Sequence, residues 1–179
     1  MKRCTLIVLA AALFLGAVSH AGSEGRLDFD IPILIAAGIN VSDLTNNSSV
    51  DVDLSSYHLP LPYVELAYQF GTDELRGGVG LRSYTLLVEF AGWPMGYVEA
   101  EFDRLVLRAE LGGLAFFLLG VYNDFKFSVT TMVPDLQVSY AIAPWFRLGA
   151  GVLAVAPLDT MKNFGWLFYI NGRFVLTFK

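Results

Sequence analysis

Several features that define common protein classes are missing from this sequence. Its one cysteine, Cys4, lies among the first residues, so the chain beyond residue 21 has no disulfide to define its fold. Its 12 Lys+Arg residues are outnumbered by 17 Asp+Glu and never cluster, which argues against a nucleic-acid-binding surface. The best candidate for a transmembrane helix beyond residue 21 covers residues 111–123, but it is too short and glycines interrupt it.

The N-terminus carries a pattern typical of an export signal. A basic pair precedes an apolar run over residues 6–18, and small residues end the segment at Ala21. This arrangement predicts a signal peptide over residues 1–21, cleaved after Ala21, followed by one domain over residues 22–179. The alternative is an uncleaved membrane anchor, which the shortness of the apolar run disfavours.

Apolar side chains are present in excess: 55% of the residues are hydrophobic and 14% are aromatic. Such a composition is unusual for an exported soluble protein and favours a membrane protein. A membrane protein without spanning helices must still pair every backbone N–H and C=O group within the hydrocarbon. Among strand-built proteins, only a closed barrel does so, and its sequence signature is alternation of apolar and polar residues.

Alternating stretches of that kind recur along the chain, separated by turn-forming residues. We predict strands over residues 26–39, 61–70, 76–90, 97–111, 114–122, 135–142, 146–155 and 166–178. The third and fourth change phase near Arg82–Ser83 and near Asp103, which we interpret as irregularities, and residues 91–96 (AGWPMG) are predicted as a turn. The even count and the alternation of short with longer connections predict an all-β, eight-stranded antiparallel up-and-down transmembrane barrel with periplasmic termini.

The C-terminal stretch GWLFYINGRFVLTFK shows the alternation most clearly. Its even positions from Trp166 to Phe178 are mostly large and apolar, and its odd positions include Asn171 and Arg173. We expect the apolar face to contact lipid and this strand to close the barrel by pairing with residues 27–35. Inside the barrel, Arg173 is then expected to meet a carboxylate, and the candidates are Asp28, Asp30, Glu65 and Glu110.

The same parity sorts other side chains into two groups. Four aromatic residues fall at predicted membrane–water levels, where aromatic girdles occur: Trp93, Trp145, Trp166 and Phe178. A polar network is predicted inside the barrel: Glu65, Gln69, Arg104, Arg108, Glu110, Asp135, Arg147, Asn171 and Arg173. A soluble periplasmic barrel fits the same alternation with its apolar face inside, but the tryptophan positions favour the membrane.

The whole chain beyond the signal peptide resembles the small bacterial outer-membrane barrels of the OmpA transmembrane domain, OmpX and OmpW types. The most specific pieces are SYAIAPWFRLGAGV, a strand, short turn and strand, and the C-terminal RFVLTF. The resemblance implies a location in the outer membrane, contact with its lipid, a monomeric state, and recognition of the aromatic C-terminal strand by the barrel-assembly machinery. One departure is that Lys179 follows Phe178.

Two hypotheses concern the interior of such a barrel. Eight strands enclose a space that side chains can just fill, so the polar residues are expected to pair as a plug. Gly149 and Gly151, predicted inward, would leave local space for a narrow polar path. The leading functional hypothesis is a porin-like, narrow passive channel or transporter for small solutes, hydrophobic ones among them. The alternative is a structural or adhesin-type protein with a plugged barrel and ligand-binding extracellular loops.

A catalytic hypothesis depends on His58, the one histidine beyond the signal peptide, with Ser55, Ser56, Asp51 and Asp53 nearby. These residue types suit nucleophilic catalysis or weak cation binding. They are also ordinary in a solvated loop, and they show no recognisable ligand spacing. We therefore predict no enzymatic activity, no cofactor and no metal site.

Overall fold

The computed structural model describes residues 23–37, 60–86, 89–120, 126–128, 131–157 and 165–178. The predicted signal peptide, the residues around His58 and Lys179 lie outside these ranges. Among the described residues, no helix is long and apolar enough to cross a bilayer.

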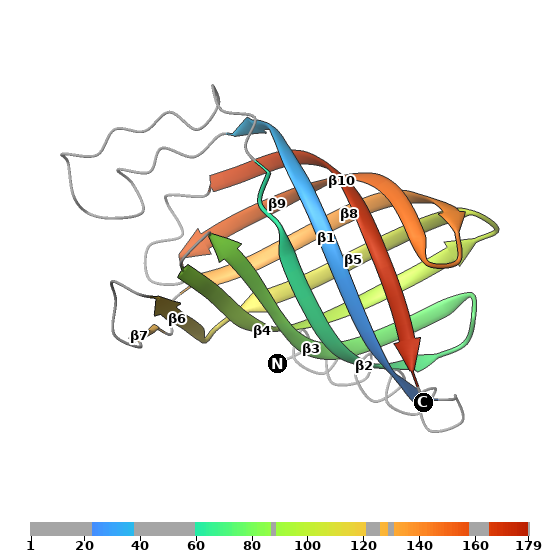
Figure 1. The fold of residues 1–179 in the computed structure, drawn as a ribbon, viewed down its shortest axis with the longest axis horizontal. Coiled ribbons are helices and arrows are strands. Elements are labelled where there is room, and N and C mark those ends of the chain that lie inside the picture. The colour runs from blue at the N-terminus through green and yellow to red at the C-terminus, as the bar shows by residue number, and fades with distance from the viewer. Residues whose placement is uncertain are drawn as a thin grey trace, which may run out of the picture.

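The described residues contain ten strands, and every pairing between them is antiparallel (Figure 1). They are β1 (Ser23–Ala37), β2 (Tyr63–Gly71), β3 (Leu75–Leu86), β4 (Glu89–Phe102), β5 (Leu105–Gly113), β6 (Phe116–Gly120), β7 (Lys126–Ser128), β8 (Thr131–Ala143), β9 (Phe146–Pro157) and β10 (Gly165–Phe178). Strands β1 to β5 and β8 to β10 pair in a ring, which the β1–β10 and β3–β4 pairings close. The predicted fold, an eight-stranded antiparallel up-and-down barrel, is confirmed.

The two ends of the barrel differ. At one end β2 connects to β3, β4 to β5 and β8 to β9 through connections of two or three residues, and β1 begins and β10 ends there. We call this the turn end; it lies to the right in Figure 1. At the opposite end, the loop end, β1 is separated from β2 by residues 38–62 of the sequence and β9 from β10 by residues 158–164, whereas only residues 87 and 88 separate β3 from β4.

The pairing of β10 with β1 closes the barrel as the sequence predicts. The register runs from Gly25 opposite Phe178 to Ala37 opposite Leu167, with one irregularity between Leu34 and Ala36. Arg173 on β10 points inward and is buried, whereas Leu176 points outward and is 55% exposed. The alternation of the C-terminal sequence therefore corresponds to the two faces of the barrel wall.

The predicted boundaries in the middle of the chain are wrong. Residues 91–96 do not form a turn but lie within β4, and the predicted strand over residues 97–111 contains the real turn at Asp103 and Arg104. The phase change near Asp103 is that turn, where Asp103 has a φ of 57°. No bulge occurs near Arg82–Ser83, because β3 keeps one register with both β2 and β4. The predicted count of eight is nevertheless correct, because two errors cancel. The predicted strand over residues 97–111 joins β4 to β5, and the predicted strand over residues 114–122 corresponds to β6, which is not one of the eight ring strands.

Pro94 explains why a segment that looks like a turn is accommodated within a strand. Proline has no N–H to donate to a neighbouring strand, so it is expected where a ladder is interrupted. The β4 strand pairs with β6 as far as Gly92 and with β5 from Met95, so Pro94 lies opposite the break between β5 and β6. At that break Leu114 has a φ of 65°, in the left-handed region.

We predict that Gly80→Ala destabilises the barrel by about 1–3 kcal/mol, because an added Cβ overpacks a fixed backbone. That Cβ would lie against the carbonyl oxygen of Leu66 and 2.7 Å from the Cα of Ala67 on β2. Gly96→Ala is the matched control on the adjacent strand, since its nearest neighbour is the carbonyl oxygen of Gly78 at 3.6 Å. Urea unfolding in detergent micelles measures both, and equal stability of the two variants would contradict the register of β2 with β3.

Candidate functional site

The interior of the barrel is filled largely by charged side chains. Inward-pointing positions alternate along each strand, and many of them carry ionisable groups. Within the described residues, five arginines and six carboxylates are at least nine-tenths buried: Arg26, Arg82, Arg108, Arg147, Arg173, Asp28, Asp30, Glu65, Glu99, Glu110 and Asp135. We call these eleven residues the ionic network. Its charges nearly balance, as a desolvated interior requires.

Arg82 on β3 lies at the centre of the ionic network. Its Nη1 donates to Asp135 at 2.8 Å, and its Nη2 donates to Glu110 at 2.5 Å and lies 3.4 Å from Glu65. Its guanidinium also lies over the ring of Tyr63, 4.3 Å from the centroid. The three acids belong to β8, β5 and β2, so this one cation joins strands on both sides of β3 through the interior.

Two further arginines extend the ionic network toward the turn end. Arg26 on β1 forms a bidentate pair with Asp28 at 2.8 and 2.9 Å and also donates to Glu99 at 3.1 Å. Arg108 on β5 donates to Glu65 and, at 3.1 Å, to Glu110. Because the planar guanidinium offers several donors, each of these arginines contacts more than one strand.

Arg173 finds the partner that the sequence predicts for it. Its Nε donates to Asp30 at 2.8 Å, and its Nη1 lies 3.6 Å from Asp28. Tyr63 accepts a hydrogen bond from Arg173 at 2.5 Å and donates one to Asp30 at 2.7 Å. Asn171, two residues earlier on β10, donates to the same carboxylate at 2.7 Å. The closing strand is thus fixed from inside by one aspartate of β1.

The ionic network reaches solvent at the turn end. Arg147 on β9 pairs with Glu99 at 3.0 Å and with Glu101 at 3.5 Å. Arg76 on β3, which is partly exposed, pairs with Glu101 at 3.0 Å and with Glu99 at 3.5 Å. The charged interior therefore continues to the mouth of the barrel at this end.

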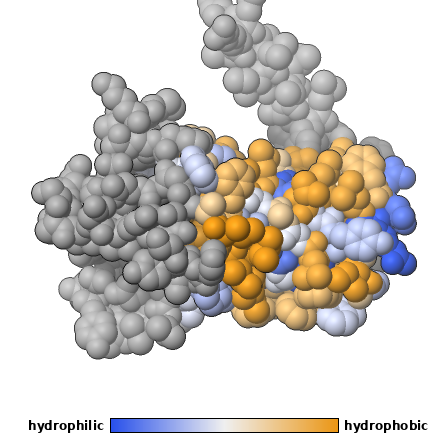
Figure 2. Space-filling view, turned by 90° about the horizontal axis from the view of Figure 1, so that it is seen from above, coloured by the Kyte–Doolittle hydropathy of each residue, from blue (hydrophilic) through white to orange (hydrophobic). Residues whose placement is uncertain are grey.

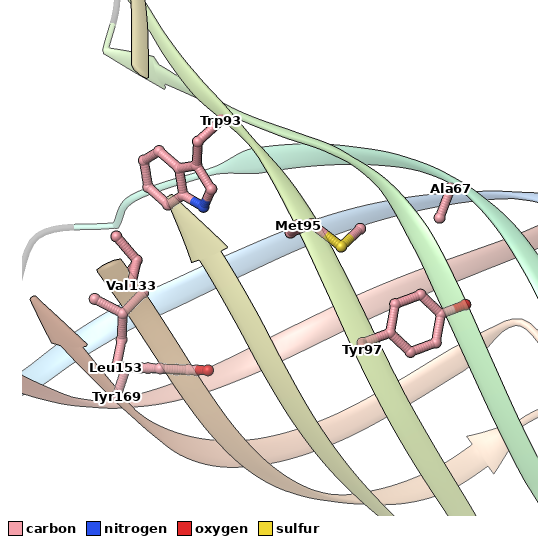
Figure 3. Close-up of a cluster of buried hydrophobic side chains, with 7 residues drawn as sticks. All are labelled: Ala67, Trp93, Met95, Tyr97, Val133, Leu153 and Tyr169. Carbon is pink, nitrogen blue, oxygen red and sulfur yellow. The ribbon is translucent and has the colours of Figure 1, made fainter. Parts of the chain in front are cut away.

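Toward the loop end the interior becomes apolar. A cluster of buried side chains occupies this region, and Figure 3 shows Trp93, Val133 and Leu153 farther from the turn end than Tyr97 and Ala67. The ring of Trp93 stacks on Tyr84 with centroids 5.1 Å apart, and Tyr84 contacts Tyr63, 5.0 Å away. An apolar layer thus lies between the ionic network and the loop end.

Inward glycines accommodate aromatic rings and do not leave open space. A Cβ on Gly151 would meet the side chain of Tyr169, and one on Gly149 would meet Asn171. Gly78 is likewise covered by Tyr97, which lies directly opposite it on β4. The expectation that Gly149 and Gly151 leave room for a polar path is therefore wrong: larger side chains of the neighbouring strand occupy that room.

The predicted polar residues fall into two groups. Those that the structure brings together inside the barrel are Glu65, Gln69, Arg108, Glu110, Asp135, Arg147, Asn171 and Arg173. The placement of Arg104 inside is wrong, because this residue is exposed in the β4–β5 turn. The error follows from the wrong strand boundary described above. The predicted strand over residues 97–111 included the turn, so Arg104 was assigned to the inward face of a strand although it belongs to no strand.

Sequence reasoning also missed members of the ionic network. Arg26 shares its phase with Asp28 and Asp30, and Glu99 shares its phase with Tyr97, so both signals were in the sequence. Arg82 lies in a strand whose parity was assigned as broken, which removed it from the predicted interior. Ending the fourth strand at Phe102 would have placed Glu99 inside.

The predicted interface aromatics occupy different environments. Trp145 is 55% exposed in the β8–β9 turn and stacks on Phe174 with centroids 6.0 Å apart. Phe178 is exposed at the turn end, and Trp166 is partly exposed near the loop end of β10. Trp93 is 8% exposed and lies inside the barrel, so its predicted interface position is wrong. The cause is again the strand through residues 91–96.

The outer wall is apolar. Large aliphatic and aromatic residues point outward from every strand of the ring, among them Phe29, Leu66, Leu81, Leu136 and Ile170. Figure 2 shows one side of this wall, with hydrophobic residues across its middle and hydrophilic ones at the turn end. Charge is thus concentrated inside and apolar surface outside, the reverse of a soluble protein.

The charged groups do not form a metal centre or a recognisable catalytic set. Within the described ranges, no group of three or more His, Cys, Asp or Glu side chains is arranged to hold a metal ion. The buried carboxylates are engaged by arginine, tyrosine or amide donors. The chemistry available to this interior is ion pairing and hydrogen bonding between fixed partners.

The chain is similar to two solved structures, at low sequence identity. No protein-family model matches the chain, and no curated protein matches it. Among solved structures, Neisserial surface protein A is 16% identical with a TM-score of 0.47, and Ail, the attachment invasion locus protein of Yersinia pestis, is 8% identical with a TM-score of 0.39. Each comparison covers 86% of this chain and 97% of the other.

We predict that Arg82→Met lowers the free energy of unfolding by about 3–5 kcal/mol, because it leaves three buried carboxylates without their shared cation. Arg104→Met is the matched control: the same change at an exposed turn position is expected to alter stability by less than about 0.5 kcal/mol. Urea unfolding followed by tryptophan fluorescence measures both. An Arg82→Met variant as stable as Arg104→Met would show that the ionic network does not hold the barrel together.

Proposed function

We propose that this chain is an exported outer-membrane β-barrel protein with a closed interior, whose role is structural or depends on its loops and not on solute passage. The observation that carries the proposal is the ionic network: buried charges fill the barrel while apolar residues cover its outside. The signal peptide predicted over residues 1–21 supplies the export route. The turn end then faces the periplasm and the loop end faces outward.

The distribution of side chains supports a membrane location over a soluble barrel. A soluble ligand-binding barrel would place its large apolar residues inward and its charges in water. Here Leu66 and Leu136 are more than half exposed, and Asp28 and Arg82 are fully buried. An apolar wall of this extent is unfavourable in water and favourable in lipid. Closure of the ring leaves no unpaired strand edge within the hydrocarbon.

The packing of the interior supports a closed barrel over a channel. Each arginine of the ionic network contacts one or more carboxylates, and opening a path would require separating these pairs in a poorly solvated space. Beyond them lies the apolar layer around Trp93, which opposes the entry of water and ions. The passive-channel hypothesis therefore gains no support from this geometry, and the loop segments are the better candidates for function.

The membrane location predicts opposite behaviour for two tryptophans. In vesicles of brominated phosphatidylcholine, a variant that keeps Trp145 alone should lose most of its fluorescence, because that exposed side chain stacks on Phe174 of the outer wall. A variant that keeps Trp93 alone should be quenched much less, because its indole is inside the barrel. Equal quenching of the two, or none, in protein that co-floats with the vesicles would contradict the proposed placement.

Closure predicts that the wild-type protein does not conduct. Proteoliposomes loaded with potassium chloride should release potassium no faster than protein-free vesicles, because the ion pairs and the apolar layer block the interior. Brominated phosphatidylcholine included in the same vesicles quenches the tryptophan fluorescence of inserted protein, so a low rate cannot reflect missing protein. Release that rises in proportion to inserted protein would overturn closure and restore the channel hypothesis.

A further inference from the structure

A hollow of about 590 Å³ lies on the outer wall. Outward-facing residues of β4, β5, β8, β9 and β10 line it; the main ones are Ala100, Leu107, Ala109, Leu136, Ala150 and Phe168. Its volume falls within the range of small-molecule sites, about 300–1,000 Å³. Its lining is almost wholly apolar, as expected for a surface that contacts hydrocarbon.

Small residues produce the depth of this hollow. Ala109 lies opposite Val98 on one side and Leu136 on the other, and Ala150 lies opposite Val138. Alanines thus alternate with larger residues along the wall, and the surface dips at each alanine. The wall formed by β1 and β2 lacks such a run, since its outward positions carry Phe29, Ile33, Val64 and Leu66.

An exposed cation lies in the turn that joins two of the strands lining the hollow. Arg104 is in the two-residue turn that joins β4 to β5, and its carbonyl oxygen accepts a hydrogen bond from the N–H of Ala141 at 2.7 Å. Ala100 precedes it by four residues and Leu107 follows it by three, which at the rise of a β-strand is roughly 10–14 Å along the wall. A long arginine side chain can cover part of that distance.

The other charged groups near this end make Arg104 distinctive. Arg76 and Arg147 are engaged by Glu99 and Glu101, and no salt bridge among the described residues involves Arg104. The other exposed charges nearby are acidic: Asp103 in the same turn, and Asp73 and Glu74 in the β2–β3 turn. Among the described residues, Arg104 is therefore the one arginine without a carboxylate partner, and its turn joins two strands that line the apolar hollow.

We propose that the hollow and Arg104 together bind one phospholipid of the turn-end leaflet, with an acyl chain in the hollow and the phosphate on Arg104. The inference rests on the membrane location proposed above. Guanidinium pairs well with phosphate oxygens, and the hollow offers apolar contact for the chain. A second copy fits less well: copies related by a two-fold axis along the membrane normal would face hollow to hollow and leave a void.

Native mass spectrometry of the barrel in non-ionic detergent with added dioleoylphosphatidylglycerol tests the site. The wild type should retain one lipid molecule. Arg104→Gln should weaken retention by about fivefold or more, as expected for one arginine at a membrane surface, and Ala109→Leu should weaken it by filling the hollow. Asp103→Asn, in the same turn, and Val64→Leu, on the opposite wall, should retain lipid as the wild type does.

Other outcomes would overturn the proposal. Equal retention by all variants, loss with Arg104→Gln but not with Ala109→Leu, or competition by inorganic phosphate alone would each contradict a combined site. A dimer dissociated by Ala109→Leu would assign the hollow to a second copy. Heat-dependent gel mobility shows that each variant is folded.

Insertion of the same proteins into vesicles of brominated phosphatidylcholine, read from tryptophan quenching, separates this inference from the proposed function. If the wild type fails to insert, the membrane location falls. If it inserts and binds lipid without regard to Arg104 or Ala109, only the phospholipid site falls.

Discussion

The pairing of arginines with carboxylates inside a closed ring is the interaction on which this structure depends. Eight strands enclose too little space for both water and side chains, so the interior must be filled, and it is filled with groups that are costly to bury alone. Arg82 shows the consequence: it satisfies Asp135, Glu110 and Glu65 at once. These three pairs join β3 to β8, β5 and β2, so charges that fill the barrel also fix its register.

That register couples the inside of the barrel to its outside. Side chains alternate along a strand, so a slip of one residue would bring the charges of the ionic network to the outer wall and the apolar wall residues inside. On β10 the ion pair of Arg173 with Asp30 and the outward position of Leu176 depend on the same alignment. The ion pairs thus specify one arrangement of the strands, whatever net free energy each contributes.

Sequence reasoning succeeded where the alternation of apolar and polar residues was uninterrupted. It failed where a strand segment has the composition of a turn. The closing strand, its pairing with β1 and the inward position of Arg173 beside a carboxylate follow from parity over residues 166–178, which left four candidates for that carboxylate. Residues 91–96 contain a proline and two glycines, which are ordinary turn signals, and only the break between β5 and β6 explains why they lie in a strand. Arg104 was misplaced for that reason. The break lies in a different part of the sequence, so residues 91–96 alone cannot reveal it.

Glycine was the other misleading signal, and its role follows from the size of the barrel. An inward glycine suggests free space when one strand is read alone. In a barrel this narrow, a large aromatic side chain that points inward from one strand requires a small residue opposite it on the next strand. Tyr97 opposite Gly78 and Tyr169 opposite Gly151 satisfy that requirement. Inward glycines paired with aromatic residues on adjacent strands therefore indicate a filled barrel, and the paired positions carry the information that neither residue carries alone.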